Sequence, residues 1–206
     1  GLSEHIKSVR FMGERGFVTT FRELDPLFAL DLSDHTEPTR VGYVTLPGYN
    51  SYMQPIDDTH LLTIGHNGIV EGIGSTQVLL FDISEITRPR IVGRHSFYLD
   101  STSIAEQDHH AFGWFAPHNV LSIPLVQNRR ERVDTDGDGY KETWVKHRED
   151  QLAILEIDVE ATTDTHDGVQ LRGAIKNDSA VMRTALIHDV PYSTTQHPLT
   201  AAHTHH

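Results

Sequence analysis

The sequence predicts an all-β fold made of repeated antiparallel hairpins, chiefly because one stretch occurs twice. Residues 26–47 (PLFALDLSDHTEPTRVGYVTLP) match residues 76–100 (TQVLLFDISEITRPRIVGRHSFYLD) at one constant offset without a gap. A third, worn copy begins at Gln151 with QLAILEIDVE, and its partner strand at 169–175 again carries a glycine. Self-similarity at this period is typical of repeat architectures. The matched pairs are Asp31 with Asp82, Ser33 with Ser84, Pro38 with Pro89, Val41 with Val92, and Gly42 with Gly93.

Each copy has the pattern of a hairpin. It begins with an apolar run that is too short for a helix and suits a buried strand. A polar turn follows, with proline near the start of the next β-rich run, where a missing N–H does no harm. We expect Asp31 and Asp82, at the end of the apolar run, to accept backbone N–H groups of the turn. Two similar hairpins could arise by chance in a sandwich, but the constant offset favours a solenoid or a propeller.

Composition limits the classes of partner. The chain has 206 residues, 37% of them hydrophobic and 22% charged, which is ordinary for a globular protein. Its net charge of −12 argues against nucleic acid or an anionic membrane surface as partner. Cysteine is absent, which excludes disulfides, thiolate metal sites and a cysteine nucleophile. No apolar stretch predicts membrane insertion, and the first residues lack a signal-peptide core, so a secreted origin would require a mature chain or a fragment.

The remaining β-rich runs complete four-stranded units. Strands at 8–12 and 16–21 precede the first hairpin, and together the four strands make one propeller blade. Strands at 51–56 and 60–65, around an Asp57-Asp58 turn, begin the second unit. The third unit begins with a strand at 108–115 (DHHAFGWF).

The predicted architecture is therefore a partial β-propeller of about three and a half four-stranded antiparallel blades. No helix of ordinary length is expected. The predicted segments, all within 1–206, are blade 1 at about 6–48, blade 2 at about 49–100, blade 3 at about 104–177 with a polar insert at 127–150, a half-blade at about 180–197 and a His-rich tail at 198–206.

Several runs carry a family resemblance. The runs SVRFMGERGFVTTFRELDPLFALDLSD, PGYNSYMQPIDDTHLLTIG, DHHAFGWF and MRTALIHD resemble a secreted prokaryotic β-propeller family whose propeller is distantly related to WD repeats. The resemblance implies an extracellular or cell-surface location, and it covers only the later part of much longer proteins. The last unit departs from the family pattern at residues 188–191, and no closing blade follows. We therefore expect a partner, either the remainder of a parent propeller or a second copy of the chain.

The sharpest local signal is an acidic loop in the insert, DTDGDGYKE at 134–142. Carboxylates at alternate positions, a glycine for the tight turn and one backbone carbonyl form an oxygen cage suited to Ca²⁺. An EF-hand would carry glutamate at position 12 of the loop, where this chain has Val145. A solvated acidic turn is the plain alternative. The predicted calcium ligands are Asp134, Asp136, Asp138, the Tyr140 carbonyl and Glu142.

Histidine is the second signal, with 15 in the chain. If Asp108 opens a strand, His109 and His110 face opposite sides and cannot share one site. His109 is then a hydrogen-bonding residue between blades, or else a ligand or base facing the central channel. The tail histidines, His203, His205 and His206, are expected to be an adventitious chelator.

Taken together, the sequence predicts an extracellular calcium-binding propeller module that acts in binding, scaffolding or surface assembly. The alternative is a metal-dependent enzyme, a hydrolase or an oxidoreductase, that uses channel-facing histidine and aspartate. No convergent set of nucleophile, base and orienting group supports an enzyme, so no catalytic residue is assigned.

Overall fold

The protein is described by a computed structural model, which covers residues 5–21, 25–46, 48–70, 73–137, 139–141, 143–162, 168–187, 190–195 and 200–201. Most of these residues lie in antiparallel strands, so the all-β prediction is confirmed. The described helices are three short 3-10 turns, η1 (Ile104–Glu106), η2 (His109–Ala111) and η3 (Ala116–His118). None of them is long or apolar enough to cross a membrane.

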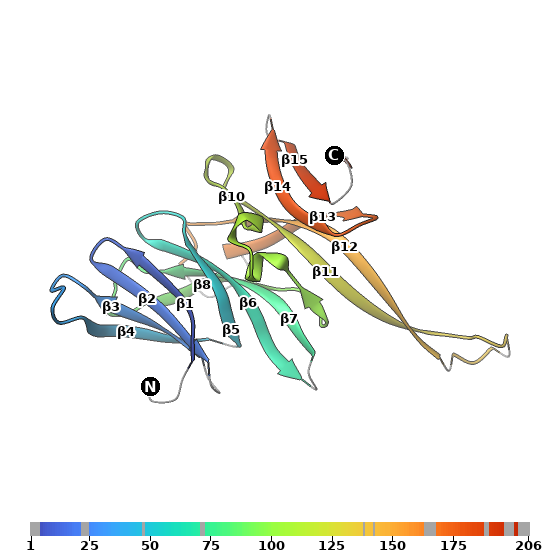
Figure 1. Ribbon diagram of the computed structural model, residues 1–206, viewed down its shortest axis with the longest axis horizontal. Coiled ribbons are helices and arrows are strands. Elements are labelled where there is room, and N and C mark those ends of the chain that lie inside the picture. The colour runs from blue at the N-terminus through green and yellow to red at the C-terminus, as the bar shows by residue number, and fades with distance from the viewer. Residues whose placement is uncertain are drawn as a thin grey trace.

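The strands form four sheets that follow one another along the chain (Figure 1). The first contains β1 (His5–Met12), β2 (Arg15–Phe21), β3 (Asp25–Asp31) and β4 (Thr39–Leu46). The second contains β5 (Tyr49–Pro55), β6 (His60–Val70), β7 (Ile73–Asp82) and β8 (Arg90–Ser96). The third contains β9 (Ser101–Thr102), β10 (Gly113–Phe115), β11 (Val120–Val133), β12 (Thr143–Ile157) and β13 (Val169–Asn177). The fourth contains β14 (Val181–Ile187), β15 (Val190–Thr195) and β16 (Thr200–Ala201).

The repeat has a structural counterpart in a β-bulge that recurs in the first three sheets. Register shifts by one residue beside Gly42 in β4, beside Gly93 in β8 and beside Gly173 in β13. A bulge places two residues of one strand opposite one residue of its partner. The three glycines are therefore equivalent, and the third copy, although worn in sequence, keeps the same backbone geometry.

Close contact between neighbouring sheets explains two of these glycines. A Cβ built on Gly42 would lie 2.4 Å from the carbonyl oxygen of Ile86, in the turn between β7 and β8. A Cβ on Gly93 would lie 2.6 Å from the carbonyl carbon of Gly168, just before β13. Each outer strand thus receives the outer turn of the following sheet against its backbone.

Two apolar clusters hold the sheets together. One joins the first two sheets through fully buried side chains such as Phe17, Leu27, Met53 and Phe81. The other lies between the second and third sheets and includes Ala105 of η1 and Ala111 of η2. Strands of adjacent sheets also contact one another, as β1 contacts β5 and β10 contacts β14. Packing sheet face against sheet face is the arrangement that stabilises a propeller.

Two local expectations were wrong. The run 108–115 is not one strand, because Asp108 accepts the backbone N–H of His110 and caps η2, so only Gly113–Phe115 forms a strand. The polar insert at 127–150 does not interrupt the blade either. It continues β11 and β12 as one ladder from Val120↔Glu156 to Val133↔Thr143. Cross-strand pairing satisfies the backbone of these residues, while most side chains between Arg129 and Arg148 are exposed.

Candidate functional site

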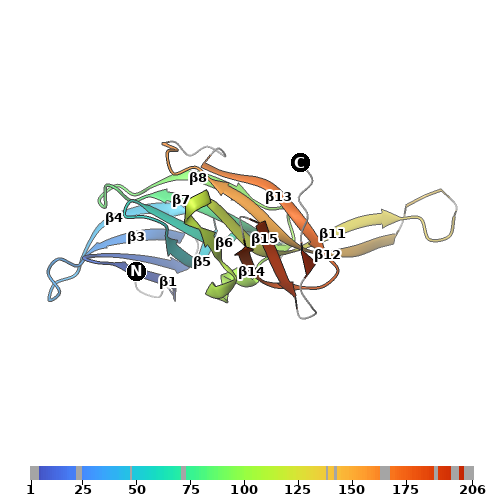
Figure 2. The same ribbon diagram turned by 90° about the horizontal axis from the view of Figure 1, so that it is seen from above.

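The extended β11–β12 hairpin, residues 127–150, is called the arm below. It reaches well beyond the other strands in both views (Figures 1 and 2). Its two large exposed aromatic side chains are Trp144, 61% exposed, and Tyr140, 76% exposed. The Arg132 guanidinium lies 5.1 Å from the Trp144 ring centroid, across the ladder.

The acidic loop forms the tip of the arm and is wound around Asp134. Its Oδ1 accepts the Gly137 N–H at 2.7 Å, and its Oδ2 accepts the Gly139 N–H at 2.8 Å. These backbone donors hold the pKa of Asp134 below its ordinary value, and the Gly139 N–H has the larger effect. Gly137 and Gly139 have φ values of +81° and +91°, which glycine adopts without strain. The loop geometry therefore depends on residues that the sequence singled out.

The predicted calcium ligands fall partly within the structure. Asp134, Asp136 and Tyr140 are among the described residues of the loop at the tip. Asp138 and Glu142 lie outside the described residues. An ionised carboxylate has about four lone-pair positions. Asp134 can therefore accept two N–H groups and still contribute an oxygen to a cation.

A second polar cluster, Asp108, His109 and His110, lies at η2 beside β14. The His110 Nδ1 is 3.2 Å from Asp108 Oδ1, and the Arg183 Nη2 of β14 is 3.3 Å from Asp108 Oδ2. The two imidazole centroids are 3.9 Å apart. The expectation that His109 and His110 face opposite sides was therefore wrong, because a 3-10 turn, unlike a strand, can place consecutive side chains together. Backbone N–H donation from His110 lowers the pKa of Asp108.

His109 also borders a cavity of about 460 Å³ that reaches the first strands of the first two sheets. Arg10 of β1 contributes its guanidinium, which lies 5.4 Å from the Tyr52 ring centroid and donates to the Met53 carbonyl at 2.6 Å. The Tyr52 hydroxyl donates to Gln54 at 2.6 Å. The cavity lining is Arg10, Ser51, Tyr52, Gln54, Ala105, Glu106, Gln107 and His109.

Glu106 is a functional candidate that the sequence reading missed. Its carboxylate is only 7% exposed and lies 3.0 Å from the His66 Nε2. It also accepts from the Thr76 hydroxyl at 3.2 Å and from the Ser103 backbone N–H at 3.3 Å. The Ser103-to-Glu106 spacing is a capping box, a signal that was readable in the sequence.

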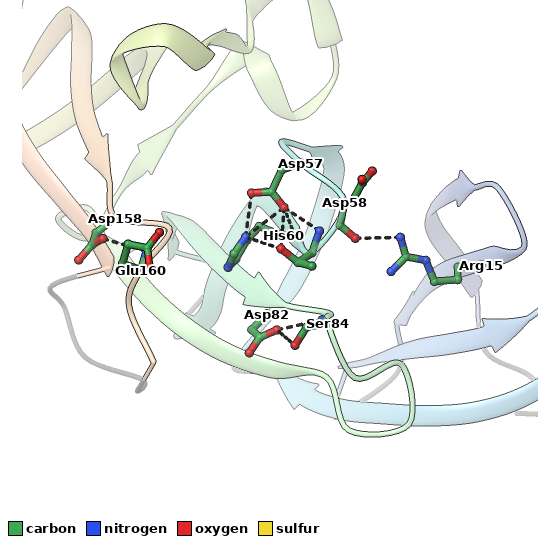
Figure 3. A network of polar contacts seen from close by, with 9 residues as sticks. Arg15, Asp57, Asp58, His60, Asp82, Ser84, Asp158 and Glu160 are labelled. Carbon is green, nitrogen blue, oxygen red and sulfur yellow. Dashed lines mark hydrogen bonds and ion pairs between the residues drawn. The ribbon is translucent and has the colours of Figure 1, made fainter.

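The turns that carry the repeated aspartates form a further polar region (Figure 3). Asp31, Asp82 and Asp158 each accept the backbone N–H two residues later, at 2.9 Å, so the turn prediction is confirmed. Asp57 receives the His60 Nδ1 at 2.8 Å, and Asp58 accepts the Arg15 guanidinium through its carbonyl at 2.8 Å. Burial opposes ionisation of Asp57, but the Thr59 N–H and the His60 ring keep its pKa below normal. These contacts hold turns in place, as expected for Asp57-Asp58.

Comparison with known proteins agrees with the fold. A model of the beta propeller domain family matches residues 1–206, and the chain belongs to that family. A protein of Archaeoglobus fulgidus is 38% identical over 128 residues, which are 62% of this chain and 20% of the relative. A protein of Methanocaldococcus jannaschii is 32% identical over 125 residues, 61% of this chain and 19% of the relative. Both relatives are described as uncharacterized, and the matched part spans about a fifth of their length.

Proposed function

We propose that this domain is an extracellular or cell-surface calcium-binding β-propeller module that acts in binding, scaffolding or surface assembly. The feature behind this proposal is the arm, which carries an acidic loop at its tip and stands clear of the packed sheets (Figure 2). An exposed hairpin of this length adds nothing to the apolar clusters. Its retention is better explained by a role in contact with another molecule.

Calcium would stiffen the tip of the arm. The proposed ligands are the side chains of Asp134, Asp136, Asp138 and Glu142 with the Tyr140 carbonyl, an oxygen-only set that suits a hard cation. Neutralising several carboxylates also removes repulsion within the loop. An ordered tip would present Tyr140 and Trp144 in a fixed arrangement, and aromatic side chains are the usual anchors of protein interfaces.

The proposed location follows from the same site. Exposed calcium loops of extracellular modules bind with dissociation constants of about 10⁻⁴–10⁻³ M, which suits calcium levels outside the cell. The exposure of the described residues at the tip supports a site of this kind. The chain contains no cysteine, so the proposal involves no disulfide.

A further part of the proposal concerns the partner. Gly173 is equivalent to Gly42 and Gly93, yet a Cβ built on it meets nothing within 4 Å among the described residues. The other two glycines each receive the outer turn of the next sheet. We therefore propose that Gly173 receives an equivalent turn, from the remainder of a parent propeller or from a second copy. Sedimentation velocity of the isolated chain should show association, and a monomer at all concentrations would contradict a second copy.

Calorimetric titration tests the calcium site. The parent chain should bind one Ca²⁺, and Asp136→Asn/Asp138→Asn should bind none measurably, because too few charged oxygens remain. Asp34→Asn is the matched control, since Asp34 is an exposed carboxylate in the β3–β4 turn that also caps a backbone N–H. Unchanged binding in the double variant, or no binding by the parent, would overturn the proposal.

A further inference from the structure

Asp108, His109 and His110 offer three ligand atoms that all lie within 4.8 Å of one another. They are the one group of this kind among the residues that the structure describes. Asp108 is held by its N-cap hydrogen bond to His110, and its side chain is 31% exposed. The His110 side chain is 58% exposed. Three ligands from one short turn, open to solvent on one side, leave a position for water.

The donor types distinguish this cluster from the acidic loop of the arm. Two imidazole nitrogens and one carboxylate oxygen are the ligands of borderline transition ions, whereas calcium prefers oxygen alone. Two histidines and one carboxylate with an open position form a known type of zinc site. The cluster therefore calls for a different ion from that of the arm.

We propose that Asp108, His109 and His110 bind one divalent transition ion of the Zn²⁺ type at the edge of the cavity that His109 lines. Ligand atoms bonded to zinc at about 2.0–2.2 Å lie at most about 4 Å apart. The two imidazole rings, whose planes now meet at 38°, turn on binding so that one nitrogen of each faces the same ion. Water completes the coordination from the exposed side.

Arg183 is the competing cation at this site. Its Nη2 lies 3.3 Å from Asp108 Oδ2, and it comes from β14 of the fourth sheet. A bound ion takes over the charge of Asp108 and weakens this contact. Metal binding therefore weakens one contact between the third and fourth sheets.

The test is zinc titration of the full 206-residue chain with His203, His205 and His206 replaced by alanine, so that the tail does not contribute. This background should bind one Zn²⁺. His109→Ala and His110→Ala should each weaken binding by more than the ~10–100-fold that follows loss of an outer-shell partner. His35→Ala, an exposed histidine in the β3–β4 turn, is the matched control and should bind as the background does.

Arg183→Gln supplies an independent readout. Removing the competing charge should tighten zinc binding by up to about fivefold, the scale of an exposed ion pair. Circular dichroism of each variant confirms folding, which the exposure of both histidines leads us to expect. No zinc uptake by the background, binding in either histidine variant as tight as in the background, or weaker binding in Arg183→Gln would overturn the proposal.

Discussion

The His66 Nε2 lies 3.0 Å from the Glu106 Oε2, and this contact joins β6 of the second sheet to η1, which lies between β9 and β10 of the third. Both side chains are largely withdrawn from solvent, at 15% and 7% exposure. The Glu106 hydrogen bond raises the pKa of His66 above its ordinary value, although burial opposes the shift. When one partner of an ion pair removed from water in this way loses its charge, the other charge is left uncompensated and the folded state is destabilised.

The first prediction is a pH dependence of stability. Because the pKa of His66 is raised on folding, its contribution is fully present below the unfolded pKa of about 6.5. The contribution is lost as the pH rises through the raised value. The free energy of unfolding from urea titrations should therefore fall as the pH rises above about 6.5 and through the raised pKa of His66.

Glu106→Gln should flatten that fall, since the amide cannot raise the pKa of His66 by charge. The matched control is Glu85→Gln, an exposed carboxylate in the β7–β8 turn that should keep the parental slope. An unchanged slope in Glu106→Gln would show that His66 is not the titrating group.

The second prediction concerns the repeated turn aspartate. Asp82 accepts the Ser84 N–H at 2.9 Å and also pairs with Arg90. Asp82→Ala leaves these donors without their acceptor, and the unfolding free energy should drop by about 1–3 kcal/mol. Asp82→Asn keeps one oxygen acceptor and should lose less. Equal losses in the two variants, measured by urea unfolding, would disprove the hydrogen-bonding role.

The third prediction contrasts two equivalent glycines. Gly93→Ala places a methyl group 2.6 Å from the Gly168 backbone and should cost about 1–3 kcal/mol through overpacking. Gly173→Ala meets nothing within 4 Å among the described residues and should leave thermal stability of the isolated chain unchanged. If both variants have the same melting temperature, the contact with the next sheet does not explain why glycine is repeated at this position.

The repeat pattern predicted much of the fold because its residues act locally. Asp31 and Asp82 cap turns two residues away, and the outer hairpins follow from short apolar runs. The close approach that makes Gly42 and Gly93 necessary was not readable, since it depends on backbone from the next sheet. The position of that backbone becomes apparent only when the sheets pack against one another.

The candidate sites were predicted less completely. The acidic loop was identified from the spacing of its residues alone. Its place at the tip of an extended ladder was not predicted, because the polar residues of a long hairpin resemble an irregular insert between strands. A strand was predicted at His109 and His110, which would have placed the two side chains on opposite faces. Asp108 instead caps a 3-10 turn, in which the two rings lie side by side. Glu106 was overlooked because its partner His66 is distant in sequence.

Hydrogen-exchange mass spectrometry with and without calcium tests the proposed calcium site of the arm most directly. Calcium bound at the proposed site would order the amides of the loop, while the sheets beyond the arm would not contact the ion. Millimolar Ca²⁺ should slow exchange in peptides covering residues 134–141 and leave peptides of β5 to β8 unchanged. Unchanged exchange at the tip of the arm, with chelator and calcium alike, would contradict the account.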